Sequence, residues 1–135
     1  MKELTVDTRM ESLPEIQAFV RAELEAMDCP EETQKQLFIV IDEVFANVAS
    51  YAYADGEGSV TVRLETESEP RAAVLTFLDS GVPFDPLTMK TPDISLKARE
   101  RKIGGLGIFM VRKLTDEVSY AYADGKNILR TVKRF

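Results

Sequence analysis

The chain has 135 residues, of which 44% are hydrophobic, and this length suits one packed core rather than two. Its formal net charge of −6 argues against a nucleic-acid partner, because phosphate binding depends on concentrated lysine and arginine. With no histidine and one cysteine, the sequence excludes histidine-dependent nucleophiles, histidine-ligated zinc and disulfide frameworks.

No stretch of the sequence predicts a membrane span or a signal peptide. The longest apolar run, Leu37–Ile41, is far shorter than the roughly 18 residues that a span needs. The N-terminus is acidic and polar, and it lacks the basic and then apolar pattern of a signal peptide. We therefore expect a cytoplasmic protein without a membrane partner.

The N-terminal half predicts one strand and two helices. Residues 2–8 alternate weakly between polar and apolar, which predicts a strand. Ser12 and Glu15 form a capping-box pattern ahead of apolar residues at helical spacing, so a helix is predicted over about 12–27. A second helix is predicted over about 30–53, with a proline and two acidic residues in its first turn. Its expected core stripe consists of Leu37, Val40, Ile41, Val44 and Val48.

The C-terminal half predicts a hairpin, a long loop, a helix and a second hairpin. Residues 58–67 and 71–80 alternate with period two, so they are expected to pair antiparallel. Residues 81–103 hold three prolines and many charges, and so long a loop is typical of a lid, placed here at about 84–103. A helix then follows a glycine turn, and residues 117–135 predict two strands around an Asp-Gly turn.

The predicted order of elements is β-α-α-β-β-loop-α-β-β within a single domain, residues 1–135. This order predicts an α/β (α+β) two-layer fold in which a mixed, mostly antiparallel sheet carries its helices on one face. The heptapeptide SYAYADG occurs twice, at 50–56 and 119–125, with unrelated flanks. The first copy is expected to end a helix, with Gly56 as its left-handed cap, and the second to form a strand and a turn.

Glu43 and Asn47 place an acid and an amide one turn apart on the same side of the second predicted helix. They lie at the margin of its core stripe, where a ligand can rest against the helix. The alternative is a hydrogen-bonded pair at a helix edge. Asp42 points elsewhere and is expected to lie in solvent.

Asp79 ends an apolar strand, and Gly81 after it permits close backbone approach. An aspartate in this place can accept a hydrogen bond from a buried amino group, such as that of adenine. The alternative is a strand end followed by an ordinary turn, because the residues around Asp79 are common in turns.

The glycine turn at 104–107 opens a helix, where free backbone N–H groups and the helix dipole favour phosphate. No Gly-Lys-Ser/Thr follows it, so it is not a Walker A loop, and it lacks the third glycine of a dinucleotide fingerprint. Four cations lie just upstream, at 97–102. The alternatives are a turn before a core helix and a solvated charged face.

In this order the three motifs resemble the N, G1 and G2 boxes of the GHKL ATPase superfamily. The boxes read Glu43-x-x-x-Asn47, Asp79-x-Gly81-x-Pro83-Phe84-Asp85-Pro86 and Gly104-Gly105-Leu106-Gly107. The Pro-Phe-Asp-Pro form and the stretch GGLGIFMVRKLTDEV are similar to the bacterial anti-sigma-factor serine kinases, and the resemblance covers nearly the whole chain. It implies a Bergerat-type fold that holds ATP and Mg²⁺ between helices, sheet and a lid.

The resemblance implies a role for each residue of the boxes. Asn47 would ligate Mg²⁺, Asp79 would bind the adenine amino group, and Glu43 would act as general base for an incoming hydroxyl. Gly81 would let the adenine approach. The nucleotide-binding residues of the third box would be Gly104, Gly105, Leu106 and Gly107, with the amides of the last three cradling phosphates.

The resemblance also extends to positions outside the boxes. Thr131, on the last strand, matches a position that supports the contact between aspartate and adenine. Tyr51 occupies a place where many relatives have histidine. The cations of the lid that can neutralise phosphates are Lys97, Arg99 and Arg101, and the sequence does not choose among them.

The implied function is that of an ATP-dependent serine/threonine protein kinase. It would phosphorylate a small anti-anti-sigma (STAS-type) partner and, when unoccupied by that partner, hold a sigma factor. The alternatives are a nucleotide-dependent partner-switching module without phosphotransfer and an α/β domain that binds no ATP. Phosphoryl transfer depends mainly on positioning and charge stabilisation, so a chain without histidine can perform it. The family also implies a homodimer.

Overall fold

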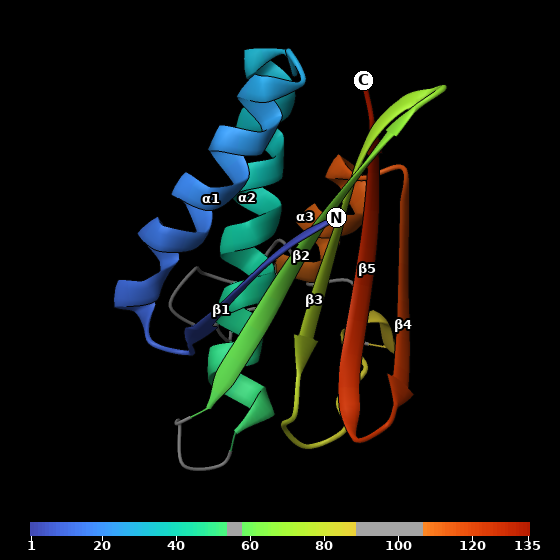
Figure 1. Cartoon of the computed structure of the whole chain (residues 1–135). Coiled ribbons are helices and arrows are strands. Elements are labelled where there is room, and N and C mark those ends of the chain that lie inside the picture. Colours follow the sequence, from blue (N-terminus) through green and yellow to red (C-terminus); the bar gives the residue numbers. More distant parts are fainter. Residues whose placement is uncertain (54–57, 89–106) are drawn as a thin grey trace, which may run out of the picture.

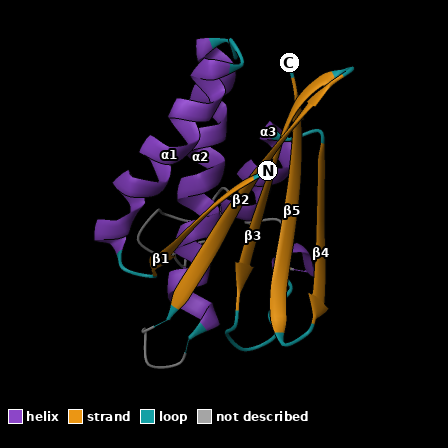
Figure 2. Ribbon diagram, in the orientation of Figure 1, coloured by secondary structure: helices purple, strands orange, loops and turns teal. Residues whose placement is uncertain are grey.

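The computed structural model describes residues 1–53, 58–88 and 107–135, which form a layer of helices on one face of a sheet (Figure 1). The predicted order of elements and the predicted α+β sandwich are confirmed (Figure 2). The strands are β1 (Lys2–Asp7), β2 (Ser59–Ser68), β3 (Arg71–Asp79), β4 (Glu117–Ala123) and β5 (Lys126–Arg134). The helices are α1 (Leu13–Ala26), α2 (Glu31–Asn47) and α3 (Gly107–Leu114), with short turns η1 (Met10–Ser12), η2 (Val48–Ala52) and η3 (Pro86–Thr88).

The described strands form one sheet in the order β1-β2-β3-β5-β4, and each neighbouring pair is antiparallel. The expected mostly antiparallel sheet therefore has no parallel pair among these strands. β3 lies in the middle, and its last residue, Asp79, pairs with Val60 on one side and Asn127 on the other. The end of β3 is thus flanked by two neighbouring strands.

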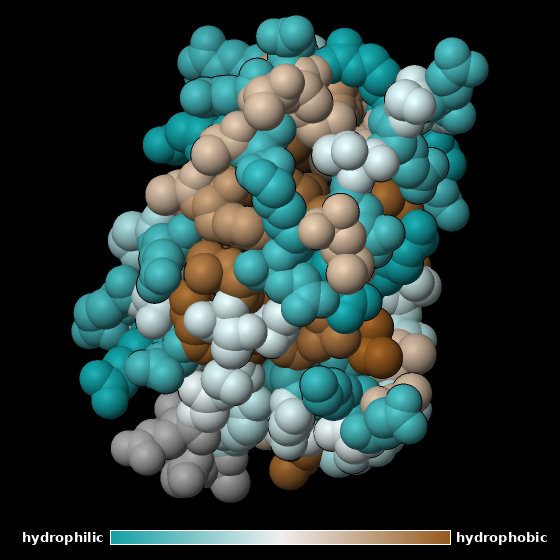
Figure 3. Space-filling view, in the orientation of Figure 1, coloured by the Kyte–Doolittle hydropathy of each residue, from teal (hydrophilic) through white to brown (hydrophobic). Residues whose placement is uncertain are grey.

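The core lies between the sheet and the helices. Ile16, Val20 and Leu24 of α1 are fully buried at the spacing of one helix face. The predicted stripe of α2 and η2 is buried throughout, at Leu37, Val40, Ile41, Val44 and Val48. Figure 3 shows hydrophobic surface mainly in the middle of the view, between the helical layer and the sheet, and hydrophilic surface toward the outer sides. α3 packs against α2 and adds Ile108 and Val111 to the same core.

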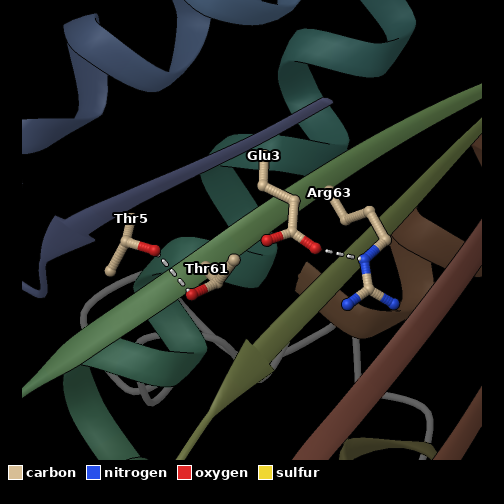
Figure 4. A network of polar contacts seen from close by, with 4 residues as sticks. All are labelled: Glu3, Thr5, Thr61 and Arg63. Carbon is tan, nitrogen blue, oxygen red and sulfur yellow. Dashed lines mark hydrogen bonds and ion pairs between the residues drawn. The ribbon is translucent and has the colours of Figure 1, made fainter. Parts of the chain in front are cut away.

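The face of the sheet that points away from the helices is polar at β1 and β2 (Figure 4). Thr5 and Thr61 share a hydrogen bond of 2.8 Å, and Arg63 Nε donates to Glu3 Oε1 at 2.8 Å. Thr61 and Arg63 alternate along β2 with the buried Val60, Val62 and Leu64. The period of two therefore assigns one face of this hairpin to the core and the other to solvent.

The start of the first helix differs from the sequence prediction. Ser12 has helical backbone angles, ends η1, and makes no capping hydrogen bond with its side chain. An N-cap residue needs extended backbone angles, so the predicted capping box of Ser12 and Glu15 is not formed. α1 begins one residue later, at Leu13.

The two copies of SYAYADG adopt different structures, as predicted. Residues 50–52 belong to η2, a π-helical turn that continues α2, whereas residues 119–123 belong to β4. Asp124 and Gly125 follow with φ of 54° and 74°, the left-handed angles of a tight hairpin turn. The predicted cap at Gly56 lies outside the described residues.

Most of the predicted lid, 84–103, lies outside the described residues, which include only its start up to Thr88. No helix in the described ranges is both long and apolar enough to cross a membrane.

Candidate functional site

A pocket opens between the end of α2, the segment after β3 and the ends of the three strands β3, β5 and β4. Apolar side chains form most of its wall, and four buried or half-buried polar side chains, those of Asn47, Asp79, Tyr120 and Asn127, also line it. This combination is typical of a small-molecule site. The lining residues are Val44, Asn47, Val48, Ala52, Phe77, Asp79, Phe84, Pro86, Tyr120, Asn127 and Leu129.

Asn47, the last residue of α2, is buried in the wall of this pocket with 4% of its surface exposed. Among the residues that the structure describes, neither its amide oxygen nor its amide nitrogen has a hydrogen-bond partner. A buried polar group without a partner costs about 1–3 kcal/mol, so a ligand that satisfies it would recover this cost. An amide oxygen is also an acceptable ligand for Mg²⁺.

Asp79 lines the same pocket and is 7% exposed. Its Oδ1 accepts two hydrogen bonds of 2.9 Å, one from the backbone N–H of Gly81 and one from Asn127 Nδ2. Among the described residues no group donates to Oδ2. One oxygen of Asp79 is therefore held by the protein, and the other is left to accept a hydrogen bond from a ligand.

Asn127, which the sequence analysis did not single out, holds this corner of the pocket together. Its Nδ2 also donates to the carbonyl oxygen of Val82 at 2.9 Å. Its Oδ1 accepts from the N–H of Phe84 at 3.0 Å and from the hydroxyl of Tyr120. Burial raises the pKa of Tyr120, which keeps that hydroxyl protonated as a donor. No local pattern marks Asn127, because its position opposite Asp79 depends on the pairing of β3 with β5.

The structure does not bring Thr131 to Asp79. Thr131 lies opposite Leu75, four residues away from Asp79 along β3, and its hydroxyl donates to the carbonyl oxygen of Leu75 at 3.0 Å. The residue of β5 that contacts Asp79 is Asn127, so any support that Thr131 gives to a contact between Asp79 and adenine would be indirect. The reason is the register of the β3–β5 pair, which a sequence motif does not specify.

Gly81 packs against the end of the helical layer. A Cβ atom at Gly81 would lie 2.1 Å from the carbonyl oxygen of Ala52 and 2.5 Å from its carbonyl carbon. The next residue, Val82, donates its N–H to the same oxygen at 2.7 Å. Glycine is therefore required here by the contact of this segment with the backbone of Ala52, whether or not a base also approaches it.

The segment after Gly81 is also anchored by aromatic contact. Tyr51 of η2 stacks on Phe84, with ring centroids 5.1 Å apart and an angle of 23° between the planes. Such stacked pairs contribute about 0.5–1.5 kcal/mol beyond the area that they bury. The stack therefore holds the wall formed by Phe84 and Pro86 against the end of α2.

Glu43 lies one turn before Asn47 on α2, half-buried, and does not line the pocket. Burial raises the pKa of its carboxyl group, and the neighbouring charge of Asp42 raises it further. Asp42 was expected in solvent, but it is half-buried and accepts a hydrogen bond of 2.6 Å from Gln17 Nε2. Packing of α1 on α2, which brings Gln17 to Asp42, is the reason for this difference. Burial also raises the pKa of Asp42.

The structure describes one of the remaining predicted site residues, Gly107. Gly107 is the first residue of α3, and α3 packs beside α2. The others, Lys97, Arg99, Arg101, Gly104, Gly105 and Leu106, lie outside the described residues. Within the described ranges there is no cluster of three or more Cys, Asp or Glu side chains that could enclose a metal ion. A single amide ligand fits Mg²⁺ that is held mostly by phosphates and water, as is usual for this ion.

The site thus combines, within an α+β sandwich, a buried acid that accepts from two donors and a buried amide without a partner among the described residues. The chain belongs to the histidine kinase-like ATPase domain family, whose pattern matches residues 6–133. This confirms the recognition of a GHKL ATPase from the order of its boxes.

Two proteins that this chain resembles in sequence bear the names of protein kinases. The serine-protein kinase RsbW of Listeria monocytogenes serovar 1/2a is 30% identical over 108 residues, which cover 74% of this chain and 66% of that protein. The serine/threonine-protein kinase BtrW of Bordetella bronchiseptica is 27% identical over 93 residues, covering 69% of this chain and 65% of BtrW. The chain thus spans slightly less than two thirds of the length of these kinases.

Solved structures share the fold. The SiaB–SiaC complex of Pseudomonas aeruginosa aligns with a TM-score of 0.60 and 19% identity, over 98% of this chain and 89% of the aligned chain. The RsbU and RsbW domains of Rv1364c from Mycobacterium tuberculosis align with a TM-score of 0.61 and 16% identity, over 99% of this chain and 32% of that one.

Proposed function

We propose that this chain is an ATP- and Mg²⁺-dependent serine/threonine protein kinase, folded as one domain with a lid at about 84–103. Its substrate is a small anti-anti-sigma protein of the STAS type, and it binds a sigma factor when that partner is absent. The observation that carries the proposal is Asn47, a buried amide that has no partner within the described ranges and lies in the wall of a pocket that also presents one oxygen of Asp79.

Each of these residues has a separate task in the proposed site. Asp79 Oδ2 accepts a hydrogen bond from the adenine amino group, while Oδ1 remains bound to Gly81 and Asn127. Asn47 would supply an oxygen ligand for Mg²⁺, and that ion would neutralise phosphate charge. Glu43 accepts the proton of the attacking hydroxyl, and its raised pKa makes it a stronger base than an exposed glutamate.

The names of the similar proteins support the proposed class of function, a protein kinase that binds a partner protein. RsbW and BtrW bear names of serine or serine/threonine kinases, and SiaB forms a complex with SiaC. These names describe those proteins, and the kinase activity, substrate and partners of this chain are our proposals. A homodimer and a cytoplasmic location, both implied by the family resemblance and composition, belong to the same proposal.

Nucleotide titration tests the binding site. Asp79→Asn retains an oxygen for Gly81 and Asn127 but turns an N–H₂ group toward the adenine amino group, so two donors meet. We expect the affinity for ATP to fall by about tenfold to a hundredfold, with the melting temperature little changed. Affinity equal to that of the unchanged protein would show that Asp79 does not bind the base.

Transfer of labelled phosphate tests the activity. The chain is incubated with Mg²⁺, γ-labelled ATP and candidate STAS-type proteins from the same organism. Label is expected on a serine or threonine of one of them, and Glu43→Gln is expected to slow transfer by about a hundredfold or more while ATP still binds. Transfer at an unchanged rate would exclude Glu43 as the base.

A partner switch without phosphotransfer is the second candidate. The observation in its favour is that Glu43 does not line the pocket. ATP binding with ATP-dependent capture of a STAS-type protein, but no label on it, would establish this function in place of the kinase.

A further inference from the structure

We propose that Asn127 is a positioning residue that sets the selectivity of the pocket for adenine. It would do so by orienting the carboxylate of Asp79 and by fixing the adjacent wall, without touching the nucleotide itself. This inference rests on the proposed function, since it assumes that the pocket binds ATP.

The Asn127 side chain uses all of its hydrogen-bond donors and acceptors within the protein. An amide side chain has two N–H donors and two acceptor lone pairs. Both donors are used, by Asp79 Oδ1 and the carbonyl oxygen of Val82, each at 2.9 Å. Both lone pairs are used, by the N–H of Phe84 and the hydroxyl of Tyr120. Asn127 therefore has no group left for a ligand and can act only through its neighbours.

The orientation of this amide is determined by its surroundings. A rotation of 180° would turn its N–H₂ group toward the donors of Phe84 and Tyr120 and its oxygen toward the acceptors of Asp79 and Val82. Three contacts, with the N–H of Phe84, the carboxylate of Asp79 and the carbonyl of Val82, would then join two donors or two acceptors, and only the Tyr120 hydroxyl could adapt by accepting instead of donating. Because Asn127 is only 6% exposed, water cannot readily replace the lost bonds. The amide is thus locked in one orientation.

The locked amide restricts Asp79 in turn. With Oδ1 held by Asn127 and by the N–H of Gly81, the plane of the carboxylate is fixed, and Oδ2 is the oxygen available to a ligand. Adenine carries an amino donor at the position where guanine carries a carbonyl acceptor. A carboxylate oxygen held in one place attracts the amino group of adenine and repels the carbonyl oxygen of guanine. A loosely held carboxylate can turn away from that repulsive contact. Selectivity for adenine therefore depends on how firmly Asn127 holds Asp79.

The same amide joins three parts of the pocket wall. Asn127 lies on β5, Asp79 ends β3, Tyr120 belongs to β4, and Val82 and Phe84 belong to the segment that follows β3. Phe84 carries the stack with Tyr51. Loss of the amide would loosen this wall together with Asp79.

Three variants separate positioning from simple stabilisation. Asn127→Ala removes all four hydrogen bonds. Asn127→Asp keeps the acceptor for Phe84 and Tyr120 but places a second carboxylate against Asp79. Thr131→Val is the matched comparison, because it removes one buried hydrogen bond on the same strand, to Leu75, without a contact to Asp79.

Binding of ATP and of GTP to each variant is measured by calorimetry, and each melting temperature is recorded. For Asn127→Ala we expect ATP affinity to fall by about tenfold to a hundredfold and GTP affinity to change by less than about threefold. Asn127→Asp is expected to lose more ATP affinity than Asn127→Ala, because two carboxylates then repel each other. Thr131→Val is expected to keep the ATP-to-GTP ratio of the unchanged protein while melting at a lower temperature.

The possible results lead to different conclusions. If Asn127→Ala left the ratio of ATP affinity to GTP affinity unchanged, the role of Asn127 would be structural and the inference would be overturned. Loss of selectivity in Thr131→Val but not in the Asn127 variants would overturn it in favour of Thr131. If the unchanged protein bound neither nucleotide, the proposed function itself would fail, a result distinct from the first two.

Discussion

Gly81→Ala tests whether the segment after β3 is held by its contact with the helical layer. The added Cβ would lie 2.1 Å from the carbonyl oxygen of Ala52, 2.5 Å from its carbonyl carbon and 2.6 Å from its Cβ. Two of these three atoms are backbone, and Ala52 is only 4% exposed, so no flexible side chain can move aside. One of the two segments must therefore shift.

The size of the effect follows from two losses. Overpacking of a well-packed site costs about 1–3 kcal/mol, and a shift would also weaken the 2.7 Å hydrogen bond from Val82 to Ala52, worth about 0.5–1.5 kcal/mol. We expect a loss of about 2–4 kcal/mol in the free energy of unfolding. For a chain of this length that corresponds to a melting temperature lower by roughly 10 °C.

Denaturant unfolding and thermal melting measure this loss, with Gly125→Ala as the matched control. Gly125 has φ of 74°, and a Cβ there would have no atom within 4 Å, so alanine meets backbone strain but no collision. Its expected cost is about 1 kcal/mol, with ATP affinity unchanged. If Gly81→Ala cost no more than Gly125→Ala, the contact with Ala52 would not be limiting and the reasoning would be refuted.

Two further changes probe the acidic pair on α2 and the core of the sheet. Asp42→Asn removes the charge that helps to raise the pKa of Glu43, so the titration midpoint of Glu43, followed by NMR of its labelled carboxyl carbon, should move to lower pH. An unchanged or higher midpoint in Asp42→Asn would show that the charge of Asp42 does not raise the pKa of Glu43. Because the pKa of Glu43 is raised in the folded state, this group stabilises the fold at pH below its ordinary value of 4.5, and that stabilisation is lost as the pH rises through the raised pKa. Leu75→Ala, at a fully buried position of β3, should cost about 2–5 kcal/mol in denaturant unfolding, and a cost below about 1 kcal/mol would mean that this part of the core is loosely packed.

Local patterns in the sequence predicted most of the fold. The spacing of Leu37, Val40 and Val44 marked the buried face of α2, and the alternation in β2 and β3 marked the two faces of a hairpin. These patterns succeed because each repeats within one element and reports which side of that element meets the core. The capping box at Ser12 failed because the backbone before α1 is already helical, in the turn η1.

The sequence also brought out two polar residues that line one pocket, Asn47 and Asp79. It did so through residue types in unusual places, an amide at the margin of a buried helix stripe and an acid at the end of an apolar strand. It could not show that Asn47 lacks a partner in the described part of the chain, nor that Asp42 accepts a hydrogen bond from Gln17, because both facts depend on how separate elements pack.

By itself, then, the sequence determined the elements, their order, the core stripes and the succession of boxes that defines the family. Tertiary structure alone decided which residue supports Asp79, why Gly81 has no side chain, and how one heptapeptide becomes a π-helical turn at Ser50 and a strand at Ser119. The physical reason is the distance along the chain between the residues that each feature depends on. Periodicity is a property of neighbouring residues, whereas the pairing of Asp79 with Asn127 joins positions 48 residues apart through the register of two strands.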